Sequence, residues 1–262
     1  MRLQKNAMMI DSHAHLELRD FDPDRDDVIT RAREAGVGAI VTIGIDIDDC
    51  LKAVEIAGNY DAVYAAVGIH PHEVKKIDRQ TYDRLRELAA HPKVVAYGEI
   101  GLDFFRNLSP RDDQIRRFGE QLELADDLNL PVIIHDREAH RETMSMLSTW
   151  KGTRRGIIHC FSGDYAMARK CLDLGFYISI PGTVTFPKAD TLRDVVRRVP
   201  VESLLVETDA PFLTPEPHRG KRNESAYVKY TAMRVAELKE MPFEEIAGIT
   251  ARNACEIFQI QI

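Results

Sequence analysis

Eight short apolar runs, each followed by a longer charged stretch, constrain the fold of this 262-residue chain more than any other feature. β-branched residues are frequent in the runs, and the stretches repeat apolar residues at helical spacing, as in Asp24–Ala35, Asp112–Leu128 and Asp190–Val199. Such alternation is typical of parallel β-α-β units. The expected strands are Met8–His15, Ala39–Ile45, Val63–His70, Val94–Ile100, Val132–His135, Gly156–His159, Tyr177–Ile180 and Leu204–Asp209.

Eight units predict an α/β fold, a (β/α)8 TIM barrel in a single domain over residues 8–262. Barrels of this kind commonly need about 250 residues, and an open doubly wound sheet of about six strands would leave two units unexplained. Phe243–Phe258 is expected to form a terminal helix packed against the outside. Residues 1–7 are polar, and we expect them to be an N-terminal extension that is disordered or precedes the true start.

The net charge of the chain is -7, from 35 Lys and Arg residues against 42 Asp and Glu residues. This balance argues against a protein whose whole surface binds nucleic acid, although a local basic rim would suffice for a nuclease. The four cysteines are far apart and form no Cys-x-x-Cys pair, which favours a reducing compartment. No apolar leader or membrane-length apolar span is evident, so we expect a cytoplasmic protein.

Histidines and carboxylates lie within or just after the ends of the predicted strands. In a (β/α)8 barrel that end carries the active site, so these side chains are expected to meet at one rim. His13 and His15 are two positions apart and therefore point to the same side of a strand. Imidazole and carboxylate ligands together suit Zn, Mn, Ni or Mg. The candidate metal ligands are His13, His15, Glu99, His135, His159 and Asp209.

Each candidate ligand alone has an ordinary explanation as a hydrogen-bonded histidine or a salt-bridged carboxylate. The whole set indicates two divalent metal ions per chain, with Mg²⁺, Mn²⁺ and Zn²⁺ as candidates, because a carboxylate such as Glu99 can bridge two cations. Asp209 is the candidate proton acceptor for a metal-activated water, and His70 and Glu207 are candidate helpers beside it. Asp103 is equally well interpreted as a salt-bridge partner of nearby arginines.

Phosphate recognition requires cations near the metals. Arg137 follows a candidate ligand by two residues, and His218–Arg222 is the most basic short segment, in a loop position that often binds phosphate in barrels. Both features also fit ordinary solvated surface. The candidate substrate-binding residues are Arg137, Arg219, Lys221 and Arg222.

Six motifs closely resemble those of the TatD-type metal-dependent deoxyribonucleases, a family of the metallo-dependent hydrolase superfamily. In chain order they are Asp11–Leu16, Gly68–His72, Gly98–Asp103, His135–Ala139, His159–Gly163 and Glu207–Pro211. The resemblance runs from Met9 to about Phe258. It implies hydrolysis of phosphodiester bonds in DNA, as a 3′–5′ exonuclease on single strands.

The resemblance also implies how the ligands divide. One metal would be held by His13, His15, Glu99 and Asp209, and the second by Glu99, His135 and His159. Where the family usually has Arg-Asn-Glu-Pro, this chain has Arg222-Asn223-Glu224-Ser225, which removes a rigid residue from the loop.

Three other functions remain open at this point. A hydrolase of a carboxylic ester or amide, such as a lactone or aminoacyl ester, would use the same metals. A one-metal deaminase would share the histidines and Asp209 but would not need Glu99 as a ligand. The third is a metal-binding or partner-binding protein without turnover, against which the intact candidates for water activation argue, Asp209 above all. We expect DNA as the partner, with no membrane and no obligatory protein partner.

Overall fold

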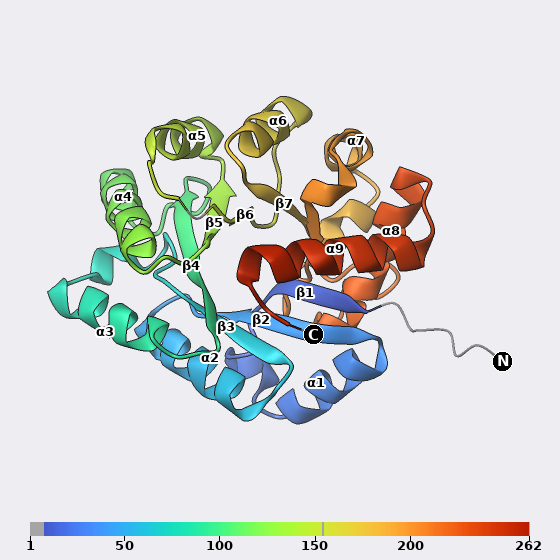
Figure 1. Cartoon of the computed structure of the whole chain (residues 1–262), viewed down its shortest axis with the longest axis horizontal. Coiled ribbons are helices and arrows are strands. Elements are labelled where there is room, and N and C mark those ends of the chain that lie inside the picture. Colours follow the sequence, from blue (N-terminus) through green and yellow to red (C-terminus); the bar gives the residue numbers. More distant parts are fainter. Residues whose placement is uncertain (1–7, 154, 262) are drawn as a thin grey trace.

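The computed structural model describes residues 8–153 and 155–261, which form the predicted (β/α)8 barrel (Figure 1). Its parallel strands follow one another around the sheet in chain order. The strands are β1 (Met9–Ala14), β2 (Val37–Ile43), β3 (Val63–Val67), β4 (Val94–Asp103), β5 (Val132–Arg137), β6 (Ile157–Ile158), β7 (Tyr177–Ile180) and β8 (Leu204–Val206). The expected extension over residues 1–7 lies outside the described residues.

Helices follow the strands and form the outer ring (Figure 1). The α-helices are α1 (Arg25–Glu34), α2 (Ile47–Asn59), α3 (Arg79–Ala89), α4 (Arg111–Asp127), α5 (His140–Thr149), α6 (Tyr165–Asp173), α7 (Asp190–Arg198), α8 (Val228–Lys239) and α9 (Phe243–Phe258). Short 3-10 helices are η1 (Arg19–Phe21), η2 (Val74–Lys76), η3 (Gly182–Thr185), η4 (Val201–Ser203) and η5 (Ser225–Tyr227). Among residues 8–153 and 155–261, no helix combines the length and apolar character needed to cross a membrane.

The predicted elements are present, but several strand ends differ. Strands β4 and β5 continue beyond the predicted ends to Asp103 and Arg137. Strand β8 stops at Val206, three residues before the predicted end at Asp209. His70 likewise lies beyond β3, which ends at Val67. The candidate site residues therefore lie partly in strands and partly in the loops that follow them.

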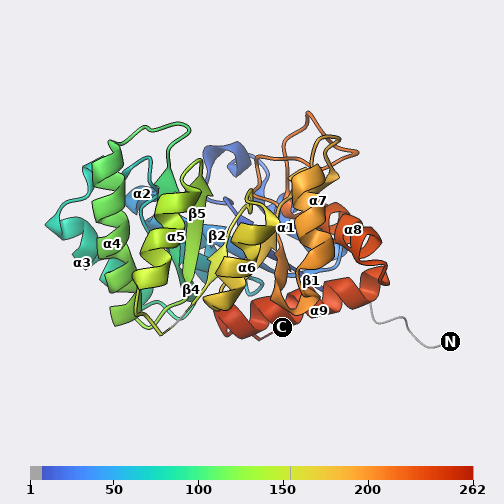
Figure 2. The same cartoon turned by 90° about the horizontal axis from the view of Figure 1, so that it is seen from above.

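The last helix, α9, covers one end of the barrel rather than its outer wall, which corrects the expectation from sequence (Figure 2). Ala251, Ala254 and Phe258 pack in one apolar cluster with interior strand residues that include Ile10 and Leu205. The physical reason is that the apolar interior at this end needs a cover that excludes water. The opposite end is left for a site.

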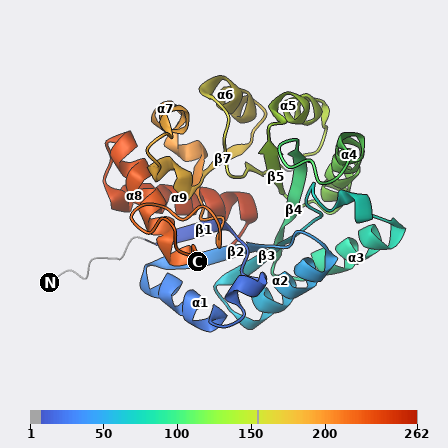
Figure 3. The same cartoon turned by 180° about the vertical axis from the view of Figure 1, so that it is seen from behind.

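Loops after the carboxyl ends of the strands rise on the side of the barrel away from α9 (Figure 2), and Figure 3 looks onto that side. Aspartates begin several of the helices that follow these loops. Asp46 accepts a hydrogen bond from the backbone N–H of Asp49 at the start of α2, and Asp78 forms a capping box with Thr81 at the start of α3. Such caps satisfy N–H groups that have no partner within the helix.

The barrel closes between β1 and the segment after β8. Ala14 and Ala210 form a parallel bridge, and the backbone N–H of Asp209 donates to the carbonyl oxygen of His13 at 2.9 Å. The buried carboxylate of Asp11 accepts a further bond of 2.6 Å from the Thr208 hydroxyl, across a sequence separation of 197 residues. This seam joins the first strand to the last, and it passes beside the candidate ligands.

Two strands lose their regular alternation where they carry candidate ligands. The register of β1 shifts between Asp11 and Ala14. Because of this shift, the adjacent residues Ser12 and His13 both face the interior, where the Ser12 hydroxyl lies 2.9 Å from the Ser179 hydroxyl of β7. The register of β4 shifts in the same way before Ile100. Bulges of this kind re-aim side chains and are common beside active sites.

Candidate metal centre

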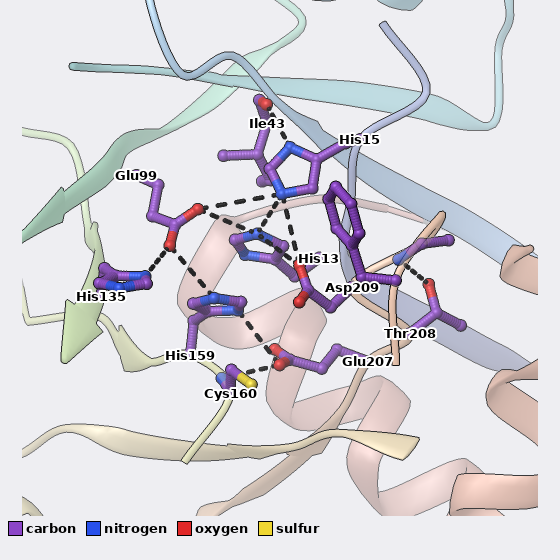
Figure 4. Close-up of polar contacts among 12 residues, drawn as sticks. His13, His15, Ile43, Glu99, His135, His159, Cys160, Glu207, Thr208 and Asp209 are labelled. Carbon is purple, nitrogen blue, oxygen red and sulfur yellow. Dashed lines mark hydrogen bonds and ion pairs between the residues drawn. The ribbon is translucent and has the colours of Figure 1, made fainter. Parts of the chain in front are cut away.

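All six candidate ligands meet at the barrel end opposite α9 (Figure 4). They line or adjoin a cavity of about 970 Å³ whose walls come from the loops after the strands. His13 is fully buried, and Glu99 and His159 are nearly so. His13, Glu99 and His135 lie on β1, β4 and β5, and His15, His159 and Asp209 lie in the segments just after β1, β6 and β8. One centre is thus assembled from five separate parts of the chain.

The first group of donors surrounds a point between β1 and the loop after β8. The Nε2 atoms of His13 and His15 are 3.3 Å apart, which agrees with their predicted orientation to one side. Asp209 Oδ1 lies 3.4 Å from His15 Nε2 and 3.8 Å from His13 Nε2. Glu99 Oε2 lies 3.4 Å from His13 Nε2 and 4.0 Å from His15 Nε2.

The second group gathers around the other oxygen of Glu99. Its Oε1 atom lies 2.5 Å from His135 Nδ1, 3.2 Å from His159 Nε2 and 3.6 Å from His70 Nε2. Figure 4 shows the Glu99 carboxylate between the two groups. One carboxylate therefore presents one oxygen to each set of imidazoles.

Further buried carboxylates orient two of these histidines. His15 Nδ1 lies 2.9 Å from the Ile43 carbonyl oxygen and 3.1 Å from Glu17 Oε1. Because a carbonyl only accepts, Nδ1 of His15 carries the proton and Nε2 is left free to act as a ligand. On the opposite side, Glu207 Oε1 lies 3.1 Å from His159 Nδ1. The two histidines thus direct Nε2 toward the centre.

Asp103 is not a salt-bridge partner of arginine side chains among the described residues, contrary to one of its two sequence-based interpretations. Its Oδ2 atom lies 2.9 Å from His72 Nε2 and 3.2 Å from His135 Nε2. Its only contact with Arg106 within this part of the chain is a 2.7 Å hydrogen bond from the backbone N–H. Asp103 therefore positions His135 from behind.

The groups of the centre shift one another's protonation. Burial by itself would raise the pKa of Glu99, but the neighbouring His159, His70 and His135 outweigh it and hold that pKa well below its ordinary value. Burial likewise opposes the charged form of His15, yet Asp209 and Glu17 raise the pKa of this imidazole well above its ordinary value. The centre thus keeps Glu99 ionised and attracts positive charge at its middle.

The residues present fit divalent cations. With metal–ligand bonds of about 2.0–2.2 Å, tetrahedral ligand atoms lie about 3.3–3.6 Å apart, and the first group spans 3.3 to 4.0 Å. The Nε2 atom of His15 also faces two carboxylate oxygens while its Nδ1 is bonded elsewhere. Such facing acceptors repel each other unless a proton or a cation lies between them. A cation held by His15, Glu99 and Asp209 would meet this requirement.

Asp209 adopts a left-handed backbone conformation, with φ of 54°. This conformation is uncommon for residues other than glycine and is tolerated best by Asp and Asn. Burial would raise the pKa of Asp209, but the hydrogen bond to His15 and the charge of His159 lower it below the ordinary value. Asp209 is therefore held ionised at the edge of the cavity.

The predicted substrate-binding cations divide between two places. Arg137 lines the cavity, as do Arg106 and Lys188, which the sequence reasoning missed. All three side chains are exposed, and among the described residues none is paired with a carboxylate. Arg219 and Lys221 are not part of the cavity lining. The missed cations share a signal that the sequence did carry: each lies in a loop after a strand.

Arg222 holds its own loop instead of lining the cavity. Its guanidinium donates to both carboxylate oxygens of Asp24, at 2.8 and 2.7 Å. Glu224 accepts from Arg31 on α1 at 2.6 Å, and the Asn223 side chain donates to the Phe212 carbonyl at 2.6 Å. These contacts fix the loop without the proline that the family usually has at the position of Ser225.

Two further residues at the centre were missed from sequence. Glu17 is 1% exposed and contacts His15, and its position two residues after His15 was the available signal. Cys160, considered from sequence only as one of four widely separated cysteines, has its sulfur within 4.8 Å of ligand atoms of His159 and Asp209. The available signal was its position directly after the candidate ligand His159.

Comparison with known proteins agrees with the fold. The family model described as TatD related DNase matches residues 10–259. The metal-dependent hydrolase YabD of Bacillus subtilis is 46% identical over 255 residues, which cover 97% of this chain and all of that protein. The 3′-5′ ssDNA/RNA exonuclease TatD of Shigella flexneri is 37% identical, with 96% of this chain and 99% of that protein covered.

Among solved structures, the TatD homologue YJJV of Escherichia coli superposes with a TM-score of 0.93 at 33% identity. The match covers 97% of this chain and 99% of YJJV. A family model spanning nearly the whole chain, full-length relatives and a barrel of the same shape all agree. The chain therefore belongs to the TatD family of metal-dependent hydrolases.

Proposed function

We propose that this protein is a binuclear metal hydrolase that cleaves phosphodiester bonds of DNA, as an exonuclease on single strands. The observation that carries the proposal is Glu99, whose two carboxylate oxygens face separate groups of imidazoles. That arrangement favours two bridged cations over the single cation of a deaminase. His13, His15 and Asp209 would hold one ion, His135 and His159 the other, and Glu99 both.

Divalent cations bound here would acidify a water molecule and stabilise negative charge on phosphoryl oxygens. The chain supplies the remaining functions. Asp209 is ionised and at the cavity edge, so it can accept the proton of the attacking water. Glu17, Asp103 and Glu207 hold the histidine rings in orientation. His70, whose burial keeps its pKa well below the ordinary value, would be a neutral hydrogen-bonding partner.

A phosphodiester substrate is supported by the charges around the cavity. Arg106, Arg137 and Lys188 line it on a chain whose net charge is -7. A neutral lactone would gain little from three unpaired cations, whereas a polyanion would gain attraction from each. The relative from Shigella flexneri is named as a 3′-5′ ssDNA/RNA exonuclease, and this name adds support for nucleic acid as the substrate class. All four cysteines are free thiols, in keeping with the cytoplasm as the proposed compartment.

The test is hydrolysis of end-labelled oligonucleotides beside a panel of carboxylic esters and lactones, with Mg²⁺, Mn²⁺ or Zn²⁺ added separately. We expect metal-dependent shortening of single-stranded DNA and no comparable ester turnover. Asp209→Asn should abolish hydrolysis while the far-ultraviolet circular dichroism is unchanged, because an amide cannot accept the proton. Turnover of an ester alone, or near-normal DNA cleavage by folded Asp209→Asn protein, would contradict the proposal.

A further inference from the structure

Large apolar side chains are exposed at the mouth of the cavity. Phe105 is 57% exposed, Leu108 53% and Phe212 52%, and they follow β4 and β8 on the side of the candidate metals. Of the other large apolar side chains exposed among the described residues, Leu51 and Met233 lie on outer helices and Met8 directly precedes β1. Exposed apolar residues gathered around a polar centre typically mark a binding surface.

Phe212 lies directly beside the candidate metal centre. It lines the cavity, and the centroid of its ring is 6.2 Å from that of the ligand candidate His15. Its backbone is fixed, because its N–H donates to the Asp209 carbonyl and its own carbonyl accepts from the Asn223 side chain. An exposed ring on a fixed backbone presents a flat apolar face at small cost in conformational entropy.

Phe105 does not line the cavity itself, but it offers a second flat surface beside two residues that do. The Arg137 guanidinium lies over its ring, 4.2 Å from the centroid, and Arg137 itself lines the cavity. Arg106, the residue after Phe105, lines the cavity too. An aromatic face with two adjacent cations matches the two parts of a nucleotide, a planar base and an anionic phosphate.

We propose that Phe212 and Phe105 are stacking surfaces for unpaired nucleobases of a single strand whose phosphates lie at the metal centre and its cations. The proposal rests on the proposed function and names the part of the substrate that the metals do not contact. In a duplex both faces of an internal base are covered by its neighbours, so such surfaces favour unpaired ends. The two rings would thereby distinguish single strands from duplexes without reading the base sequence.

Charge complementarity selects this occupant over a protein. The mouth combines exposed rings with Arg106, Arg137 and Lys188, although the chain as a whole is acidic. A second copy of this chain, with net charge -7, would meet the same cations only through acidic patches and would have no use for the metals. A nucleic-acid strand satisfies the cations, the rings and the metal centre together.

The test measures binding separately from cleavage. The probe is a phosphorothioate oligonucleotide that resists hydrolysis and carries 2-aminopurine, whose fluorescence is quenched by stacking. The protein is the full chain loaded with Mn²⁺. The companion ligand has the same length and phosphates but abasic residues in place of nucleotides. The variants are Phe212→Ala, Phe105→Ala, the ring-retaining Phe212→Tyr, and Met233→Ala as an exposed apolar control on α8.

Each alanine variant should weaken binding of the base-bearing strand by about 5- to 150-fold, the effect typical of losing one base–aromatic stack. Binding of the abasic strand should be unchanged, and Phe212→Tyr and Met233→Ala should bind like the original protein. Equal losses for both strands, no loss for either, or no fluorescence change with the original protein would overturn the proposal. A changed oligomeric state in sedimentation with unchanged DNA binding would overturn it as well, in favour of an interface between copies.

Cleavage of an unmodified oligonucleotide, measured in parallel, separates this proposal from the function on which it rests. Base-dependent binding without cleavage would remove the nuclease proposal and leave the stacking surfaces standing. Cleavage by all variants, with no preference for the base-bearing strand, would support the nuclease proposal and remove the stacking surfaces.

Discussion

The cavity cations offer the most quantitative test of the proposal that this acidic protein binds a polyanionic strand. Arg106, Arg137 and Lys188 line the cavity, and within residues 8–153 and 155–261 no carboxylate neutralises them. We therefore expect the variant with all three replaced by glutamine to bind single-stranded DNA more weakly and with less dependence on salt. The variant should fold normally, because the three side chains are exposed.

The magnitude follows from counterion release. Each phosphate contact on a single strand contributes about 0.7 to the slope of log affinity against log salt, so three contacts contribute about 2.1. When the salt concentration rises from about 50 to 200 mM, these three contacts alone account for a roughly 18-fold loss of affinity in the original protein. The variant should no longer show this part of the loss. Fluorescence anisotropy with a cleavage-resistant oligonucleotide at four or more salt concentrations measures both slopes.

Two controls make the comparison specific. Replacing Arg33, Arg84 and Lys170, which are exposed on outer helices, changes the net charge equally and should leave the slope nearly unchanged. Replacing Arg219 and Lys221 tests the loop favoured from sequence, and it should reduce the slope less than the cavity variant does. Arg222 is left in place because it is bonded to Asp24. If only the loop variant flattens the slope, the reasoning from the cavity lining is refuted.

Three further outcomes are expected. Glu99→Gln should lower the metal content below two equivalents in elemental analysis, since Glu99 faces both donor groups; an unchanged single equivalent would favour the one-metal plan. The hydrogen bond from Arg222 lowers the pKa of Asp24 from 3.8 to about 2, so this pair stabilises the fold above pH 4 and loses its effect as the pH falls through 2. Asp24→Asn should therefore cost about 1 kcal/mol at pH 7, after allowance for solvent screening, and progressively less as the pH falls from 4 through 2; a pH-independent difference in thermal denaturation would contradict this assignment. Phe258→Ala should cost about 3–5 kcal/mol in denaturant unfolding because Phe258 is 2% exposed beneath the barrel, and a loss below about 1 kcal/mol would show that α9 contributes little there.

The architecture was predictable because alternation of apolar runs and amphipathic stretches is a local property of the sequence. Strand β7 and helix α9 have the predicted ends. The place of α9 was not predictable, because an apolar helix face packs equally well on an outer wall or beneath a barrel. Only the open apolar interior around Ile10 and Leu205 distinguishes the two, and that interior forms from strands distant in sequence.

The meeting of the candidate ligands at one rim was predictable, because the carboxyl ends of barrel strands carry the active site. The orientation of their side chains was not predictable. Strict alternation would direct Ser12 and His13 to opposite faces, and the register shift in β1 brings both inside. Arg222 illustrates a second limit. A basic loop on its own gives no sign of the partner that each cation finds, and Asp24, far away in sequence, takes this one.

The seam between β1 and the segment after β8 has a consequence for how the molecule gains its activity during folding. His13 and His15 stand on one side of the seam and Asp209 on the other, so no stretch of consecutive units contains the whole first donor group. A partly folded chain that has completed only its inner units, β2 to β7, would therefore contain only Glu99 of that group. Ligands that bind only the closed form draw the folding equilibrium toward closure. Circular closure of the barrel is thus also the step that completes the first donor group.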